Sequence, residues 1–221
     1  LRGFPSIRIA GLMTHLSTAD SDPEYVAEQL EGFALARGLV RRFGHEPAVL
    51  HAANSAALFR HPETHFDWVR PGLALYGYPG SDSIDAPLRP ALRWRTEVLR
   101  IRTLEPGESA GYGRSFRAGS RTLLATIPVG YGDGLLRSAS NRGEVLIRGV
   151  RCPIVGHVAM DLSTIDVSSI PEVEIGDEAL LLGEQNGASL DARDLADAAR
   201  TIPYEVLTNV SRRVPRLYLN G

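Results

Sequence analysis

Lysine is absent from this sequence: all 24 residues in the combined lysine and arginine count are arginines. A codon bias toward arginine accounts for most of the surface positions. A carbonyl cofactor that is held through a lysine amine has no lysine to attach to here, and only an N-terminal amine remains for such a bond. The absence therefore excludes covalent lysine catalysis by these 221 residues alone.

The sequence also has only one cysteine, no long apolar run and no strong net charge. The one cysteine, Cys152, excludes an intrachain disulfide and a cysteine-built zinc or redox site, and it favours a reducing compartment. No stretch approaches the ~18 consecutive apolar residues of a membrane span, and the first residues lack the order of a signal peptide. The net charge of −2, without long runs of like charge, indicates neither a nucleic-acid nor a membrane partner. We expect a cytoplasmic protein with a small-molecule partner.

Short apolar runs alternate with helical patterns over the first ninety residues. The sequence predicts strands over residues 8–13, 48–52 and 66–69, a long helix from Asp22 to Gly44, and a short helix over residues 54–59. This alternation is typical of parallel βα units, in which the carboxyl ends of the strands carry the ligand site. Three or four such units cannot close an eight-stranded barrel, so we expect further barrel segments before Leu1.

The pattern changes after residues 79–90, which are rich in Gly, Ser, Asp and Pro and read as a linker. The sequence then predicts strands over 93–104, 122–129, 144–147, 153–158, 162–167 and 178–182, followed by helices over 189–200 and 201–210. This spacing suits an antiparallel barrel or sandwich. The predicted fold class is α/β plus β: the C-terminal part of a (β/α)8 barrel over residues 1–88, then a mainly antiparallel β-domain over residues 89–221.

Polar residues follow each of the three strands predicted in the first part, and we expect them to converge on one mouth. They are Thr14, His15, Asn54, Ser55, Arg70 and Gly72. A helix N-terminus and free backbone N–H groups after a glycine are what a phosphate needs, so the pattern indicates a phosphorylated ligand. The alternative is structural, because strand-end histidines are often core residues and Asn-Ser after a strand is often a plain helix cap.

A tyrosine stands among three glycines in the second part. The segment PVGYGDG, residues 128–134, places Tyr131 directly after an apolar strand, where a flexible turn would expose its phenol. The alternative is a glycine-rich hairpin in which Tyr131 has no role and Asp133 is a turn former.

Six segments together resemble bacterial alanine racemases in their order and approximate spacing. They are GLMTHLSTAD, HAANSAAL, VRPGLALYG, IPVGYGDG, VGHVAMD, and TIPYEV followed by RRVPR, and they span nearly the whole chain. The family resemblance implies a fold-type III pyridoxal 5'-phosphate barrel followed by a β-domain. It also implies a head-to-tail homodimer in which each site borrows residues from the partner. A lysine-containing motif and the first barrel strands would then precede Leu1.

The resemblance also implies roles for individual residues in proton transfer. Tyr131 matches the catalytic tyrosine that serves one face of the substrate α-carbon while the missing lysine serves the other. His15 matches the residue that hydrogen-bonds this tyrosine. Arg70 matches the residue that faces the pyridine nitrogen, to which it can donate a hydrogen bond but not a proton.

Further matches concern the cofactor phosphate, the substrate and the entrance. The phosphate contacts match Ser55, the backbone of Gly72 and Leu73, and Tyr204, with Asn54 beside them. Met160 matches a main-chain contact to the substrate carboxylate, and Asp161 and Asp20 match residues near the entrance. The structural alternatives are that Met160 is core filler, Asp161 a turn residue and Tyr204 a helix-face aromatic.

Two departures from the family bear on substrate access and preference: Ala159 stands where many relatives have cysteine, and His157 where many have arginine. The leading hypothesis is interconversion of L- and D-alanine, which supplies D-alanine for peptidoglycan. One alternative is a broader amino-acid racemase of the same fold. Another is a non-catalytic remnant that dimerises with an intact racemase. A sugar-phosphate-binding barrel fragment would not explain the glycine-flanked Tyr131.

Overall fold

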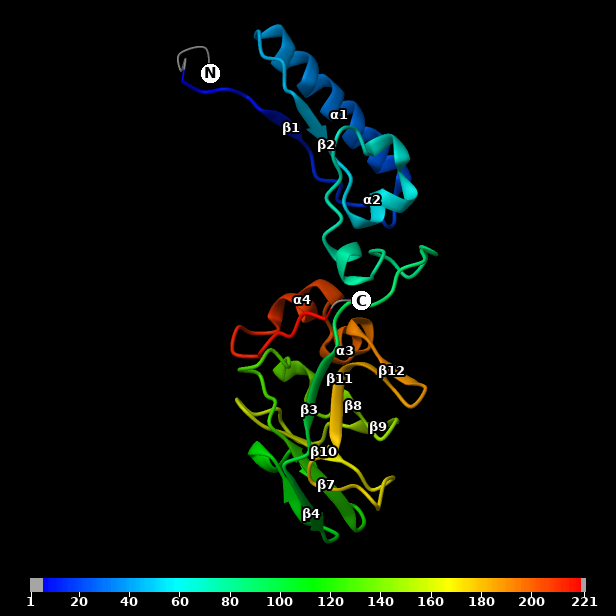
Figure 1. The fold of residues 1–221 in the computed structure, drawn as a ribbon, viewed down its shortest axis with the longest axis vertical. Coiled ribbons are helices and arrows are strands. Elements are labelled where there is room, and N and C mark those ends of the chain that lie inside the picture. The colour runs from blue at the N-terminus through cyan, green and yellow to red at the C-terminus, as the bar shows by residue number, and fades with distance from the viewer. Residues whose placement is uncertain (1–5, 220–221) are drawn as a thin grey trace. The chain divides into compact units, whose positions relative to one another are not determined.

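The chain folds as two compact units, and the computed structural model describes residues 6–219 (Figure 1). Unit 1 comprises residues 1–91 and unit 2 comprises residues 92–221. The strand pair of unit 1 is parallel, whereas the strand pairings among the described residues of unit 2 are antiparallel. The predicted succession of an α/β part and a mainly antiparallel β part is confirmed.

Unit 1 is built on two short strands, β1 (Gly11–Met13) and β2 (Val49–His51), which are joined by helix α1 (Pro23–Arg42). Helix α2 (Ser55–Arg60) and the 3-10 helices η1 (Pro62–Thr64) and η2 (Leu73–Tyr76) follow. The core of the unit is small and rich in alanine. It consists of Leu16, Ala19, Val26, Ala52, Ala53, Ala56, Ala57 and Ile84. Short side chains let α2 pack closely on the strand ends, which keeps the polar residues that follow the strands near one another.

Helix α1 forms as its sequence predicts. The Asp22 side chain accepts a hydrogen bond from the N–H of Tyr25 at 3.1 Å, and Pro23 occupies the first turn, where its missing N–H costs nothing. Gly44 follows the helix in a left-handed conformation with φ of 81°. Val26 and Phe33 are the buried residues of the helix. The burial of this one face holds α1 on the strand pair.

The predicted third strand, Phe66–Val69, is wrong. Only Trp68 forms a strand-like bridge, to His51 of β2, in parallel sense. Phe66 has φ of 48°, which breaks the extended run, and the Asp67 carboxylate accepts the N–H of Leu50 at 2.8 Å. A side chain thus takes the place of a main-chain ladder bond, so the segment runs beside β2 without pairing as a strand.

Unit 2 contains two principal antiparallel sheets. The first has the order β10-β7-β4, formed by Ser163–Asp166, Thr122–Ile127 and Arg100–Leu104. The second has the order β12-β11-β8-β9, formed by Ala188–Leu190, Glu178–Gln185, Glu144–Ile147 and Val150–Pro153, and β3 (Trp94–Glu97) pairs with β11. Leu146, Ile147 and Leu180 are fully buried between these elements. The sheets form the framework from which the loops of unit 2 project.

Two predicted strands of unit 2 need correction. The predicted single strand over 93–104 is in fact two strands, β3 and β4, which belong to different sheets. The N–H of Val98 donates to the main-chain oxygen of Asp177, whereas that of the next residue, Leu99, donates to the main-chain oxygen of Thr126. The strand over 153–158 is also wrong, because Pro153 ends β9 and Gly156 has φ of 78°. That segment makes only one strand-like bridge, from Ile154 to Ile165.

The last helices are α3 (Ala192–Ala199) and α4 (Pro203–Asn209). The predicted start at Ser189 is wrong, because residues 188–190 form β12 and Asp191 caps α3 in a capping box with Asp194. The sequence did not predict β9, β12 or the small hairpin of β5 (Ser109–Ala110) and β6 (Phe116–Arg117). The 3-10 helices η3 (Tyr112–Arg114) and η4 (Arg137–Ala139) complete the unit.

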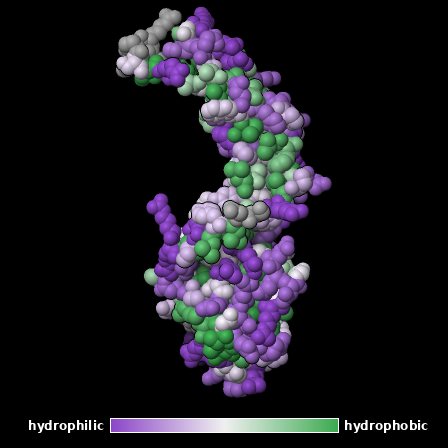
Figure 2. All heavy atoms as spheres, in the orientation of Figure 1, coloured by the Kyte–Doolittle hydropathy of each residue, from purple (hydrophilic) through white to green (hydrophobic). Residues whose placement is uncertain are grey.

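The surface mixes hydrophobic and hydrophilic residues, as the face drawn in Figure 2 shows. Two leucines of α1, Leu35 and Leu39, remain 72% and 55% exposed. Within residues 6–219, no helix is both long enough and apolar enough to cross a membrane.

Candidate active site

Arg70 is the centre of a polar cluster in unit 1. Its guanidinium lies 2.7 Å from Nδ1 of His51 and donates to the main-chain oxygens of Thr14 at 2.8 Å and Ala52 at 3.2 Å. The His15 ring is at the margin of this network, with Nδ1 3.5 Å from Nη2 of Arg70. The structure thus brings together Thr14, His15 and Arg70, which follow two different apolar segments of the sequence.

These contacts fix the charge and the donors at the strand ends. A guanidinium has donors only, so Nδ1 of His51 is the acceptor in this contact. Burial lowers the pKa of Arg70, but an arginine remains a cation at neutral pH. Its Nε–H has no acceptor among residues 6–219. The cluster therefore holds a fixed cation with a donor left over for a ligand.

Sequence reasoning missed His51. It is the last residue of β2, in register with Met13 of β1, and its ring lies 6.1 Å from the Trp68 ring. The signal was present, because a histidine that ends an otherwise apolar strand is placed like Thr14 and His15. Its position within the run from Ala48 to Ala52 hid it among core residues.

Asn54 and Ser55 tie unit 1 together. The side-chain oxygen of Asn54 caps α2 by accepting the N–H of Ala57 at 3.0 Å, and its side-chain amide nitrogen donates to the main-chain oxygen of Leu16 at 3.0 Å. Ser55 is buried, and its Oγ accepts the N–H of Ala74 at 3.0 Å. The structural alternative therefore describes Asn54 well, whereas Ser55 still has a hydroxyl proton to donate.

The segment after Arg70 offers backbone donors. The N–H of Gly72 bonds to the main-chain oxygen of Arg70 at 2.9 Å, and that of Leu73 has no acceptor among the described residues. A Cβ at Gly72 would meet nothing within 4 Å, so the space beside this backbone is open. Leu73 N–H and the Ser55 hydroxyl are the donors in this region that an anion would find.

Tyr131 lies in a loop of unit 2 that is more rigidly held than the sequence predicts. Its N–H donates to the main-chain oxygen of Ala159 at 2.9 Å, and the N–H of Gly132 donates to that of Met160 at 2.8 Å. A Cβ at Gly130 would lie 2.3 Å from the Ala159 oxygen, so this glycine permits close backbone approach. The structure thus shows a hydrogen-bonded loop where the sequence predicts a flexible turn. The phenol is exposed, at 44%, from a fixed loop.

A second tyrosine with the same local pattern was missed. Tyr112 stands between Gly111 and Gly113, whose φ angles are 76° and 66°, and it is 72% exposed. The Tyr112 loop packs against another segment of unit 2, because a Cβ at Gly111 would lie 3.1 Å from the backbone nitrogen of His157. The triplet Gly-Tyr-Gly was the available signal, because it occurs at both tyrosines.

Met160 and Asp161 lie on the turn that faces the Tyr131 loop. Met160 is 53% exposed, and its N–H has no acceptor among residues 6–219. Asp161 accepts a hydrogen bond from Arg213 at 2.5 Å. Tyr204, 44% exposed, is on α4 in the same unit. Asp20 is in unit 1, where its main-chain oxygen accepts from a guanidinium nitrogen of the neighbouring Arg60 at 2.6 Å.

His157, one of the two departures from the family pattern, has a buried Nδ1 with no hydrogen-bond partner among the described residues.

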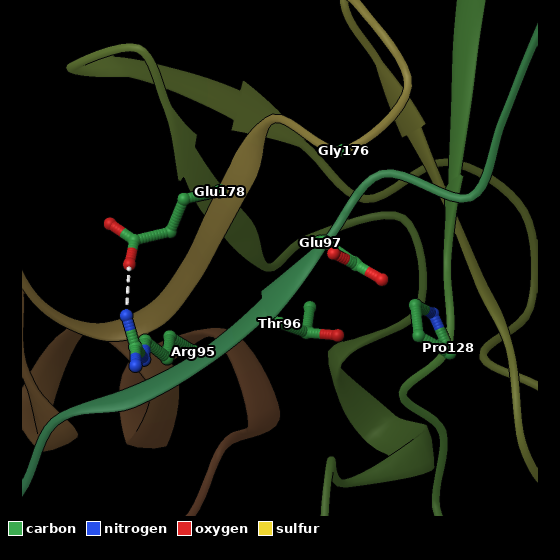
Figure 3. Close-up of a pocket in the computed structure, with 6 residues that line it drawn as sticks. All are labelled: Arg95, Thr96, Glu97, Pro128, Gly176 and Glu178. Carbon is green, nitrogen blue, oxygen red and sulfur yellow. Dashed lines mark hydrogen bonds and ion pairs between the residues drawn. The ribbon is translucent and has the colours of Figure 1, made fainter.

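A separate open hollow of about 500 Å³ lies in unit 2 and is drawn in Figure 3. It is lined by Arg95, Thr96, Glu97, Pro128, Gly176 and Glu178. Arg95 points toward Glu178 and pairs with it at 3.2 Å, and no predicted site residue lines the hollow.

The chain has a parallel α/β part with an arginine held at its strand ends, and an antiparallel unit with exposed tyrosine loops follows. This combination defines a class of proteins with a barrel followed by a β-domain. Two family models match the chain: "Alanine racemase, N-terminal domain" over residues 1–79 and "Alanine racemase, C-terminal domain" over residues 91–218. The chain belongs to the alanine racemase family.

Individual relatives agree with this assignment. An alanine racemase of Sorangium cellulosum is 43% identical over 99% of this chain and 59% of its own length, and one of Symbiobacterium thermophilum is 45% identical over 96% and 57%. Among solved structures, the alanine racemase of Bacillus anthracis with bound L-Ala-P gives a TM-score of 0.93 at 34% identity, over 100% of this chain and 58% of that chain. The enzyme of Streptomyces lavendulae gives 0.91 at 38% identity, over 100% and 59%. These structures confirm the barrel portion followed by a β-domain, and the chain spans less than three fifths of each relative.

Proposed function

We propose that these residues form part of a pyridoxal 5'-phosphate-dependent alanine racemase that interconverts L- and D-alanine in the cytoplasm and supplies D-alanine for peptidoglycan. Residues 1–88 would be the partial barrel that binds the cofactor, and residues 89–221 the β-domain. A lysine from outside these 221 residues would supply the second base. The observation that carries the proposal is the Arg70 cation, held by His51 and two main-chain oxygens at the ends of β1 and β2.

The donor set in unit 1 fits the cofactor. When bound, pyridoxal phosphate supplies an electron-withdrawing ring that makes the α-proton of an amino acid removable. The phosphate would be held by Ser55 and the backbone of Gly72 and Leu73, where the Leu73 N–H and the space beside Gly72 are open. Tyr204 would contribute a further phosphate contact, and Asn54 would fix the helix start beside it.

Arg70 would donate a hydrogen bond to the pyridine nitrogen rather than a proton. Its contacts to His51 and Thr14 leave the Nε–H free for such an acceptor within the described residues. Because a guanidinium does not give up its proton at neutral pH, the ring nitrogen would stay unprotonated. This arrangement would limit the ring as an electron sink and favour simple proton transfer over side reactions.

Proton transfer on one face of the α-carbon would use Tyr131, with His15 as its hydrogen-bond partner. A phenol has a pKa near 10, so it acts as a base at neutral pH only where neighbouring groups favour its anion. Met160 would bind the substrate carboxylate through its main-chain N–H, which has no acceptor among residues 6–219, and Asp161 and Asp20 would lie near the entrance.

Tyr112 is a second candidate for the same role. A phenol that serves a site on another subunit has to project beyond its own chain, and Tyr112 is 72% exposed whereas Tyr131 is 44% exposed. We infer a homodimer with shared sites, in which His15, Ser55 and Arg70 of one chain meet the tyrosine of the other. Two equivalent sites per dimer would result.

Phenylalanine variants of both tyrosines test the assignment in the whole protein that contains these residues. If Tyr131 is the base, Tyr131→Phe lowers the rate constant of racemisation by about 10²–10⁴-fold while cofactor affinity is unchanged. The loss should differ between the L-to-D and D-to-L directions. Tyr112→Phe is the matched control, and the reverse ranking of the two variants would move the role to Tyr112.

Substrate range separates the alternatives. A broad-specificity racemase would turn over serine or a basic amino acid with kcat/KM near that for alanine, whereas the proposed enzyme would not. A non-catalytic remnant would form mixed dimers with an intact racemase and show no turnover in any form. Chiral chromatography of the products and sedimentation of the mixture distinguish the three.

A further inference from the structure

Arg213 joins two segments of unit 2 that carry proposed site residues. Its Nε lies 2.7 Å from one carboxylate oxygen of Asp133, and its Nη2 lies 3.2 Å from the other. The same Nη2 donates to Asp161 at 2.5 Å. Asp133 belongs to the Tyr131 loop, whereas Asp161 follows Met160 on the facing turn. One guanidinium therefore bridges the two segments.

The glycine beside Tyr131 is part of this arrangement. A Cβ at Gly132 would lie 2.9 Å from Cζ of Arg213 and 3.0 Å from both of its Nη atoms, so the guanidinium rests directly on the loop backbone. The backbone N–H of Ser211, two residues before Arg213, also donates to the main-chain oxygen of Asp133 at 2.9 Å. The segment after α4 thus packs against the tyrosine loop through both main-chain and side-chain contacts.

Asp133 is built into the loop as well as into the ion pair. Its Oδ2 accepts the N–H of Gly130 at 2.9 Å, and its side chain is 13% exposed. Burial raises the pKa of this carboxyl, but the hydrogen bonds from Arg213 and Gly130 and the attraction of the guanidinium together hold it below its ordinary value. The carboxylate is charged at neutral pH, so both partners of the ion pair carry their charges there.

We propose that Arg213 is a positioning residue, which holds the Tyr131 loop against the Met160–Asp161 turn and so fixes the phenol relative to the main-chain N–H of Met160. The inference rests on the proposed function, in which these two groups contact the substrate. It requires arginine in particular, because a planar guanidinium can contact Asp133 through two nitrogens and Asp161 at the same time. A lysine ammonium lacks this planar fork.

Amide hydrogen exchange on the 221-residue chain tests the positioning without any cofactor. Arg213→Gln should raise the exchange rates of the backbone amides in residues 130–134 and 159–161 by about tenfold. The reason is that removing a charged hydrogen-bond partner shifts the local opening equilibrium toward the open state. Exchange in β7 and β11 should not change, which shows that the fold is intact. Arg212→Gln is the matched control, because Arg212 has no side-chain hydrogen bond or ion pair among residues 6–219. Equal exchange in both variants would overturn the proposal.

Kinetics of the whole protein test the consequence for the site. Arg213→Gln should raise KM for alanine and lower kcat, each by about tenfold. Arg213→Lys should recover part of the loss, whereas Arg212→Gln should retain normal values. A loosened loop with unchanged kinetics would overturn the link to the substrate. If Tyr131→Phe is also without effect, the site assignment itself fails while the loop result stands.

Discussion

Replacing His51 tests whether the Arg70 cluster depends on the histidine that sequence reasoning missed. Two variants of similar size separate the hydrogen bond from packing: His51→Leu removes the acceptor, and His51→Gln keeps one. The 2.7 Å contact from His51 Nδ1 to Arg70 is the shorter of the two side-chain contacts of this guanidinium, because His15 is at 3.5 Å. Without His51, one N–H at a half-buried site loses its acceptor.

The expected magnitude follows from these contacts. A hydrogen bond to a charged group contributes about 1.5–3 kcal/mol, and solvent access at a half-buried cation removes part of this value. We therefore expect the free energy of unfolding of His51→Leu to be about 1–2 kcal/mol lower than that of His51→Gln. The main-chain oxygens of Thr14 and Ala52 still hold Nη2, so the side chain should become mobile rather than leave the cluster.

Urea unfolding of the 221-residue chain measures this difference, and the ¹⁵N signal of the Arg70 side chain reports its order. In the whole protein, the same variants should weaken cofactor binding in the same ranking, by about tenfold for each 1.4 kcal/mol of lost interaction energy. If the two variants unfold at the same urea concentration and leave the Arg70 signal unchanged, His51 does not support the guanidinium.

Four other expectations follow from the structure. The 221-residue chain with added pyridoxal phosphate should form no D-alanine from L-alanine, and turnover of ~1 per second or more would contradict the need for an outside lysine. Mixing whole-protein variants Tyr131→Phe and Arg70→Ala should restore activity, since one site of a mixed dimer carries neither change. No recovery after demonstrated subunit exchange would refute site sharing. Gly130→Ala should destabilise unit 2 in thermal unfolding, because its Cβ would lie 2.3 Å from a main-chain oxygen, whereas Gly32→Ala in α1 should stabilise by about 0.5–1 kcal/mol. The stabilisation from the lowered pKa of Asp133 should be complete above about pH 4 and lost as the pH falls below it, and Asp133→Asn should flatten that acid dependence.

The parts of the fold that the sequence predicted correctly depend on local chemistry. The N-cap at Asp22, the proline after it and the glycine at residue 44 defined α1, and each works within a few residues of its own position. The break in the predicted strand 66–69 has a different origin. It depends on the Asp67 carboxylate reaching the backbone of Leu50, a partner 17 residues away that no local pattern reveals.

The same distinction explains which site residues could be predicted. The position of Arg70 in the site could be predicted because it follows an apolar run, and the carboxyl ends of neighbouring parallel strands lie at the same edge of a sheet. Arg213 lies in the segment RRVPR, but its role could not be predicted, because its partners Asp133 and Asp161 are 80 and 52 residues away. No periodicity or spacing rule connects positions that far apart.

The two glycine-flanked tyrosines show where a local pattern stops being informative. Around Tyr131, both glycines lie against neighbours distant in sequence: the backbone at Ala159 lies against Gly130, and the Arg213 guanidinium lies against Gly132. Around Tyr112, Gly113 has open space beside it and a left-handed backbone. Gly111, in contrast, does lie close to a neighbour, because a Cβ there would be 3.1 Å from the backbone nitrogen of His157. The same triplet therefore serves close packing at both glycines in one loop, and close packing together with a left-handed backbone in the other. A Gly-Tyr-Gly pattern predicts an exposed phenol, but in the proposed homodimer the phenol that meets a substrate would be selected by the subunit opposite it, which no local pattern reveals.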